Sequence, residues 1–167
     1  MQRIHTITPC LWFDSQAEEA ATFYTGIFRN SKINRVSRYT RAGQEVHGRR
    51  PGSVMVVAFE LERQPFTALN GGPAFEFNEA ISLQVNCDTQ QDVDYYWDKL
   101  AAGGDARAQQ CGWLKDRFGL SWQVVPTSLA EMLADHDSEK SQRAMLAMLH
   151  MKKLDIAKLQ SAHAGAY

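Results

Sequence analysis

Apolar residues recur three and four positions apart in two stretches of the chain, which is the pattern of an amphipathic helix. The first stripe consists of Ala17, Ala20, Ala21, Tyr24, Ile27 and Phe28, and the second of Val93, Tyr96, Trp97, Leu100 and Ala101. Ser15 with Glu18, and Thr89 with Asp92, precede these stripes in the S/T-x-x-acid form of a helix-capping box. The pattern predicts two helices, with Ser15 and Thr89 as N-caps and Gly103-Gly104 ending the second.

Short apolar runs bounded by polar, Gly or Pro residues precede and follow each helix and predict strands. Residues 4–13 precede the first helix, and residues 81–86, in which apolar and polar side chains alternate, precede the second. The strands predicted after the first helix are 33–39, 54–61 and 66–70, and those after the second are a short segment near Ala108, 112–114 and 120–125. The polar start and the glycine of residues 115–119 predict a hairpin turn between the last two strands.

The two halves of the chain resemble one another at fixed offsets. Asp14-Ser15 and Asp88-Thr89 occupy equivalent places, and an aromatic residue, Phe23 or Trp97, follows each Asp by nine positions. Fixed-offset similarity is the trace of an internal duplication. The sequence therefore predicts an α+β fold of two βαβββ modules, the first over about residues 1–73 and the second over about 74–127.

Residues 128–167 differ from both modules and predict a helical tail. Leu129, Met132 and Leu133 share one stripe, and a second helix beginning near Ser138 carries Met145, Leu146, Met148, Leu149 and Leu154. Methionine at this spacing is typical of adaptable packing. We expect the tail to pack on the sheet or on a partner subunit, and residues 160–167 to be frayed.

Composition limits the classes of function. The 167 residues are 44% hydrophobic and 22% charged, which is typical of a folded protein and has room for a single domain. A net charge of -1 with dispersed basic residues argues against nucleic acid as a partner. No run reaches the ~18 consecutive apolar residues of a membrane helix, and the N-terminus lacks a signal-peptide core. Three cysteines without a CxxC pair indicate reduced thiols, a cytoplasmic location and no structural zinc site.

Several motifs spread over nearly the whole chain form a specific set. They are Ile-Thr-Pro-Cys-Leu-Trp-Phe at 7–13, Ala-Leu-Asn-Gly-Gly-Pro at 68–73, Phe-Asn-Glu-Ala-Ile-Ser at 77–82, Cys-Gly-Trp-Leu-Lys-Asp at 111–116, Trp-Gln-Val-Val-Pro at 122–126, and the tail 139–156. Together they resemble the PhnB-like proteins of the vicinal-oxygen-chelate superfamily, which includes glyoxalases, bleomycin-resistance proteins and extradiol dioxygenases. The resemblance implies that both modules form a curved mixed sheet, and that the protein is a homodimer.

Members of this group often carry the name 3-demethylubiquinone-9 3-methyltransferase. A methyl donor of the adenosylmethionine type is normally held by a glycine-rich turn between a strand and a helix of a doubly wound sheet. Gly71-Gly72 and Gly103-Gly104 lack the GxGxG spacing of such a turn, so the residues argue against that chemistry.

The metalloenzymes of the superfamily hold their ion with His and Glu on the first and last strands of each half. Two of the matching positions here hold Asn70 and Gln123. The residues of the first strand that face the site are either Thr8, Cys10 and Trp12 or Ile7, Pro9 and Leu11, depending on which way the strand is turned. Those of the fifth strand are either Ala80, Ser82 and Gln84 or Ile81 and Leu83. Amide oxygens bind zinc or iron weakly. His5 precedes the matching position and is interpreted as a surface or partly buried side chain. We therefore predict no metal and no cofactor, and identify no catalytic residue.

The concave sheet is the predicted site of a small organic ligand, because aromatic walls supply apolar area while amides orient a ligand. The candidate lining is Trp12, Phe66, Asn70, Ser82, Gln84, Trp113 and Gln123, with Gln123 pointing inward and its neighbour Trp122 pointing the opposite way. Each aromatic residue, taken singly, is equally consistent with a core position. Two alternatives remain open: a metal-dependent lyase, isomerase or dioxygenase using Asn70, Gln123 and Glu79, or an interaction protein assembled through the helix at 138–151.

Overall fold

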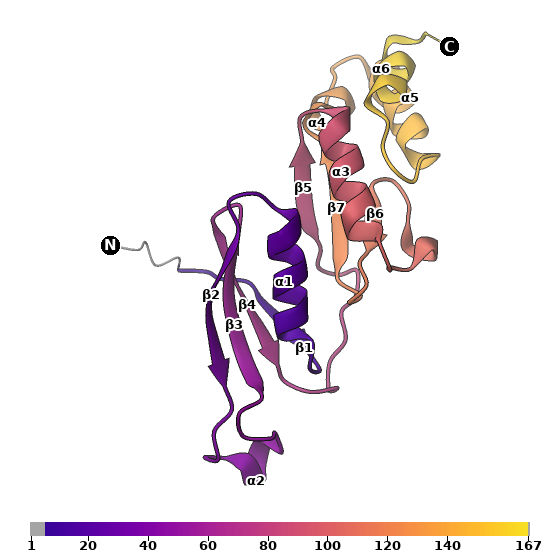
Figure 1. The fold of residues 1–167 in the computed structure, drawn as a ribbon. Helices are drawn as coiled ribbons and strands as arrows, with labels where there is room; N and C mark the ends of the chain where they lie inside the picture. Colours follow the sequence, from indigo (N-terminus) through magenta and orange to yellow (C-terminus); the bar gives the residue numbers. More distant parts are fainter. Residues whose placement is uncertain (1–5, 167) are drawn as a thin grey trace. The chain divides into compact units, whose positions relative to one another are not determined.

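A computed structural model describes residues 6–166, which divide into two compact units between Phe77 and Asn78 (Figure 1). Ile4 and His5, the first two residues of the predicted strand at 4–13, lie outside the described residues. Each unit contains its own sheet and its own covering helix. That the whole chain acts as one domain stays a prediction.

The first unit is a four-stranded mixed sheet with one long helix. Its elements are β1 (Cys10–Phe13), α1 (Ala17–Ile27), β2 (Lys32–Arg38), α2 (Gln44–His47), β3 (Val54–Leu61) and β4 (Gln64–Asn70). The strand order is β1-β4-β3-β2, in which β1 is parallel to β4 and the other neighbours are antiparallel. α1 packs on this sheet through the apolar stripe that the sequence predicts, since Ala17, Ala20, Ala21, Tyr24 and Ile27 are buried.

The second unit repeats this topology with one strand fewer. Its elements are β5 (Leu83–Cys87), α3 (Gln90–Ala101), η1 (Ala106–Ala108), β6 (Trp113–Lys115), β7 (Ser121–Pro126), α4 (Thr127–Leu133), α5 (Ser138–Leu149) and α6 (Ile156–Ala164). The strand order is β5-β7-β6, and the first strand is again parallel to the last. The α+β class, the strand–helix–strand repeat and the helical tail are therefore confirmed.

The strand predicted near Ala108 is wrong, because this segment is the 3-10 turn η1. The Asp105 carboxylate accepts a hydrogen bond from the Arg107 backbone N–H at 2.9 Å, and the Ala108 N–H donates to the Asp105 carbonyl at 3.0 Å. A side chain that bonds its own nearby backbone favours a turn over a sheet ladder. Residue Gln110 makes only an isolated bridge to Trp113.

The two predicted helix caps have different outcomes. Thr89 caps α3 as predicted, because its side chain accepts a hydrogen bond from the Asp92 N–H at 3.1 Å. The prediction for Ser15 is wrong: α1 begins at Ala17, and the Ala17 N–H donates at 2.8 Å to Oδ1 of Asn70, which lies at the end of β4. A side chain remote in sequence therefore satisfies a helix N-terminus that the local motif leaves without a side-chain cap.

The tail builds a small core of its own. Leu129, Met132, Ala144, Leu154 and Leu159 are buried together between α4, α5 and α6. Leu154 lies in the loop after α5 rather than on that helix, so its predicted place is wrong. The predicted fraying is also wrong as far as Ala164, because burial of Leu159 and Ala162 holds α6 to the core. No helix among residues 6–166 is long and apolar enough to cross a membrane.

Candidate functional site

Alternation along the strands gives each sheet two different faces. Val57, Phe59 and Leu61 of β3 are buried beneath α1, whereas Val56 and Ala58, which alternate with them, are half-buried on the opposite side. The same alternation in β7 buries Trp122 and Val124 and leaves Gln123 half-buried. We call the face of each sheet that points away from α1 or α3 its far face.

Trp12 lies on the far face of the first sheet. It alternates with the buried Leu11 and Phe13 and is paired with Leu69 of β4. Its indole N–H donates to the Gly72 carbonyl at 2.8 Å, and its ring meets the edge of Phe75 at a centroid distance of 4.9 Å. The ring is therefore held in place by the chain that follows β4.

Phe66 and Asn70 lie on the opposite face of that sheet, beneath α1. Phe66 stacks on Phe59 at a centroid distance of 5.4 Å, and Phe59 in turn stacks on Tyr24 of α1 at 6.5 Å. The Asn70 amide, besides accepting from Ala17, donates to the Val54 carbonyl at 3.1 Å and is 6% exposed. The structure does not bring these two predicted pocket residues to the far face, because both are used in packing.

The other four predicted residues come together on the far face of the second sheet. Gln84, Gln123 and Trp113 form a row across β5, β7 and β6, since Gln123 is the register partner of both Gln84 and Trp113. Ser82 joins this row by accepting a hydrogen bond from Gln123 Nε2 at 2.9 Å. The neighbouring Trp122 points the opposite way, where it is buried and its indole donates to Asp116 at 2.8 Å.

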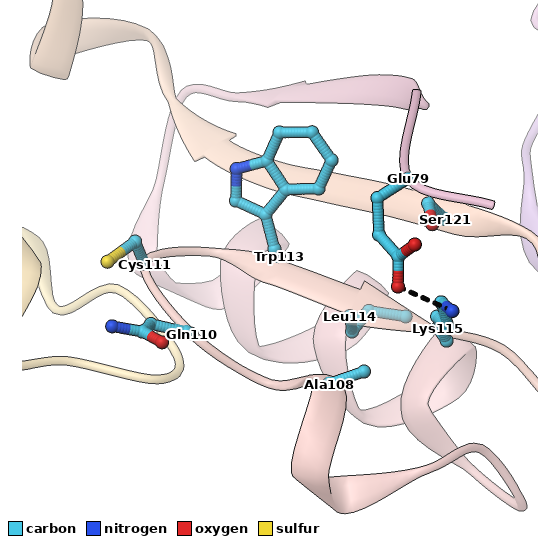
Figure 2. A pocket seen from close by; sticks show the side chains of 8 residues that line it. All are labelled: Glu79, Ala108, Gln110, Cys111, Trp113, Leu114, Lys115 and Ser121. Carbon is cyan, nitrogen blue, oxygen red and sulfur yellow. Dashed lines mark ion pairs between the residues drawn. The ribbon is translucent and has the colours of Figure 1, made fainter. Parts of the chain in front are cut away.

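A pocket of about 400 Å³ adjoins this row at the edge strand β6 (Figure 2). The polar, sulfur-containing and aromatic side chains that line it are Glu79, Gln110, Cys111, Trp113, Lys115 and Ser121. Figure 2 shows Glu79 reaching toward Lys115 beside the Trp113 ring, and Lys115 Nζ lies 2.5 Å from Glu79 Oε1. The hydrogen bond from Lys115 holds the pKa of Glu79 below its usual value. The pocket thus combines an aromatic wall with one cation, one carboxylate and one hydroxyl.

Lys115 and Ser121, like Gln110 and Cys111, line the pocket but were not among the predicted site residues. Lys115 stands two positions after Trp113, and Ser121 stands two positions before Gln123, so strand alternation places all four side chains on one face. The register of β6 with β7 makes Lys115 and Ser121 direct partners. The period-two signal was therefore present, but the pairing between the strands was needed to bring the side chains together.

Comparison with known proteins identifies the family. Residues 5–125 match the family described as 3-demethylubiquinone-9 3-methyltransferase. The chain belongs to this family. A PhnB protein from Bacillus cereus is 34% identical over 74% of this chain and 100% of its own length, with a TM-score of 0.64. The resemblance to PhnB-like proteins is thereby confirmed.

Two further comparisons add less about this PhnB-like chain. Protein PA1353 from Pseudomonas aeruginosa, at 19% identity over 74% of this chain and 98% of its own, has a TM-score of 0.57 and shares the fold alone. A comparison with curated proteins gives no match.

The glycines of this PhnB-like chain do not fit the methyl donor that the family name implies. Gly71-Gly72 follows β4 and leads into residues 73–82, where the structure has no helix. Gly103-Gly104 ends α3, with Gly103 at a φ of +79°, and is followed only by the short turn η1. Neither pair is the strand-to-helix turn whose backbone N–H groups receive an anionic cofactor.

The positions that the superfamily resemblance implies as metal ligands fit an ion equally poorly. Asn70 is buried with both ends of its amide hydrogen-bonded to α1 and β3, and Gln123 bonds to Ser82. Gln84 is a neutral amide as well, and its Nε2 donates to Asn86 at 2.8 Å. Within residues 6–166, no three His, Cys, Asp or Glu side chains gather as metal ligands. We derive no chemical step through a metal.

Proposed function

We propose that this PhnB-like protein binds a small organic ligand on the far face of its second sheet, without a metal. The observation that carries the proposal is the row Gln84–Gln123–Trp113 with Ser82 beside it, of which Trp113 also lines the pocket at β6. Trp113 offers the apolar area, and the amides offer donors and acceptors that orient a ligand.

The partial exposure of the side chains in this row supports a role in binding rather than in packing. Gln84 is exposed, and Gln123 and Trp113 are half-buried, whereas Trp122 and Val124 in the same strands are 2% and 0% exposed. The side chains on the other face of these strands already form a complete core. The indole and the two amides of this face are therefore not needed for packing and are available to a ligand. Trp12 is a half-buried aromatic residue on the far face of the first sheet.

Chelator-treated protein should bind ligands as well as untreated protein does. We expect at least one class of metabolite in a thermal-shift panel to raise the melting temperature, because a ligand that binds only the folded state stabilises it by mass action. The rise should survive treatment with EDTA and shrink in Gln123→Leu. Loss of the shift after chelation, together with stoichiometric metal in the untreated protein, would instead support the metal-dependent lyase, isomerase or dioxygenase. No stabilisation by any class would defeat the binding proposal.

The quaternary state that we propose is a homodimer. Met145, Leu146 and Leu149 of α5 are 40%, 56% and 47% exposed, and their spacing puts them on one stripe of the helix. The opposite side of α5, at Ala144, is buried in the tail core. A contiguous exposed apolar stripe beside a complete core is typical of an interface, and we propose a second copy of this chain as its partner. We also propose a cytoplasmic location, consistent with the free thiols of Cys10, Cys87 and Cys111.

Leu146→Glu should convert the dimer to a monomer, because it places a charge in the middle of this apolar stripe. Size-exclusion chromatography with light scattering at micromolar concentration measures the mass. Val46→Glu is the matched control: Val46 is 86% exposed on α2, outside the stripe, and its replacement should leave the dimer intact. A wild-type monomer at micromolar concentration would contradict the proposal.

A further inference from the structure

The Ser121 hydroxyl is a buried polar group without a hydrogen-bond partner among residues 6–166. Ser121 is 1% exposed and lines the pocket at β6. Leaving a buried hydroxyl unpaired destabilises the folded state, so such a group in a native fold calls for an explanation. Because Ser121 lines the pocket, a ligand atom there that accepts a hydrogen bond from its hydroxyl would explain this group.

The neighbour of Ser121 defines the charge of that ligand atom. Lys115 is its direct register partner on β6, so the two side chains leave neighbouring strands on the same far face, and both line the pocket. The Lys115 side chain is 26% exposed and has three donors, of which Glu79 takes one. A hydroxyl donor next to an ammonium favours an anionic oxygen, because hydrogen bonds to charged groups are the stronger ones.

Glu79 already supplies such an oxygen, but it is held loosely. Its side chain is 62% exposed and lies in the segment before β5, outside any helix or strand. An exposed ion pair contributes little stability, since water and salt screen it. The Glu79 carboxylate can therefore leave Lys115 at small cost when another carboxylate arrives.

We propose that the pocket binds a small carboxylate with an apolar or aromatic body, and that Glu79 is its built-in competitor. The ligand carboxylate accepts hydrogen bonds from Lys115 Nζ and Ser121 Oγ, and its apolar body lies against the Trp113 ring. Glu79 occupies Lys115 while the pocket is free and is displaced on binding. This inference rests on the proposed function and names its ligand class.

Matched probes separate charge from shape. We choose benzoate with benzamide and phenylacetate with phenylacetamide, titrated to millimolar concentration against ¹⁵N-labelled protein. The Trp113 indole N–H signal, assigned with Trp113→Phe, reports binding at the pocket. We expect the carboxylates to shift this signal and to bind about tenfold more tightly than their amides, which corresponds to one charge-assisted hydrogen bond.

Three variants test the roles of the polar side chains. Lys115→Met should lower carboxylate affinity about tenfold or more and abolish the preference over the amide. Glu79→Gln should do the opposite and raise carboxylate affinity severalfold, because the internal competitor loses its charge. Ser121→Ala should lower carboxylate affinity about fivefold without lowering the melting temperature, since it removes a hydroxyl that has no partner in the free protein.

The outcomes distinguish this inference from the proposed function. If amides shift the Trp113 signal as well as carboxylates do, the pocket binds ligands but the anion inference fails. If Glu79→Gln and Lys115→Met both weaken carboxylate binding, the ion pair is part of the pocket wall and the competitor role fails. If no probe shifts the signal, the inference fails, and the metabolite panel then decides the proposed function independently.

Discussion

Replacing Asp116 by alanine should lower the free energy of unfolding by about 3–5 kcal/mol. Asp116 is 2% exposed and sits in the turn between β6 and β7. Its Oδ1 accepts from the backbone N–H groups of Phe118 at 2.8 Å and Leu120 at 3.1 Å, and its Oδ2 accepts from the Trp122 indole at 2.8 Å. Alanine would leave these three buried or half-buried donors without their acceptor. Urea denaturation followed by circular dichroism measures the loss.

Two further variants show whether the lost acceptor is the cause. Asp116→Asn retains an oxygen for one set of donors and should lose about half as much stability. Combining Asp116→Ala with Trp122→Phe removes one orphaned donor along with its acceptor, so the double variant should be more stable than the sum of the single losses predicts. An Asp116→Ala protein that unfolds at the wild-type urea concentration would show that the carboxylate is not needed to hold the turn.

Asn70→Ala should lower the free energy of unfolding by about 2–4 kcal/mol, again measured by urea denaturation. The amide joins the N-terminus of α1 to the sheet, because it accepts from Ala17 and donates to the Val54 carbonyl. Alanine leaves a buried helix N–H and a strand carbonyl unpaired. The same substitution would also leave a cavity beneath α1, which adds to the loss.

Ser15→Ala is the matched control for this prediction. Ser15 is the cap that the local motif predicts, but it is exposed and its side chain does not cap α1. Its replacement should change stability by less than about 0.5 kcal/mol. A larger loss in Ser15→Ala than in Asn70→Ala would mean that the local capping box, rather than the remote amide, holds the start of the helix.

The contrast between Ser15 and Thr89 shows where sequence reasoning stops. Both residues stand in the sequence pattern of a capping box, but only Thr89 caps its helix in the structure. At the first helix, the amide oxygen of Asn70, which is 53 positions away in sequence, accepts the hydrogen bond from the first N–H of the helix. No pattern in residues 14–18 contains that information.

The candidate site was also only partly predictable, because strand alternation is local whereas the pairing of strands and helices is not. Alternation within β7 correctly separated Gln123 from Trp122, because successive side chains of a strand point to opposite faces. Alternation could not say that Phe66 and Asn70 face α1, since the spacing along a strand does not specify which face the helix covers. It also could not make Ser121 the neighbour of Lys115, because that depends on the register between two strands.

The sequence by itself determined the kind and place of most elements. Periodicity alone located α1, α3 and α5 and reproduced the strand Val54–Leu61, because the spacing of apolar residues is set by the geometry of each element and by the side that must leave water. Only the tertiary structure decided which side chains meet. Asn70 of β4 pairs with the start of α1, and Ser121 of β7 pairs with Lys115 of β6. These pairings join segments that are separated along the chain, and they follow from packing and strand register, which the local spacing of residues does not specify.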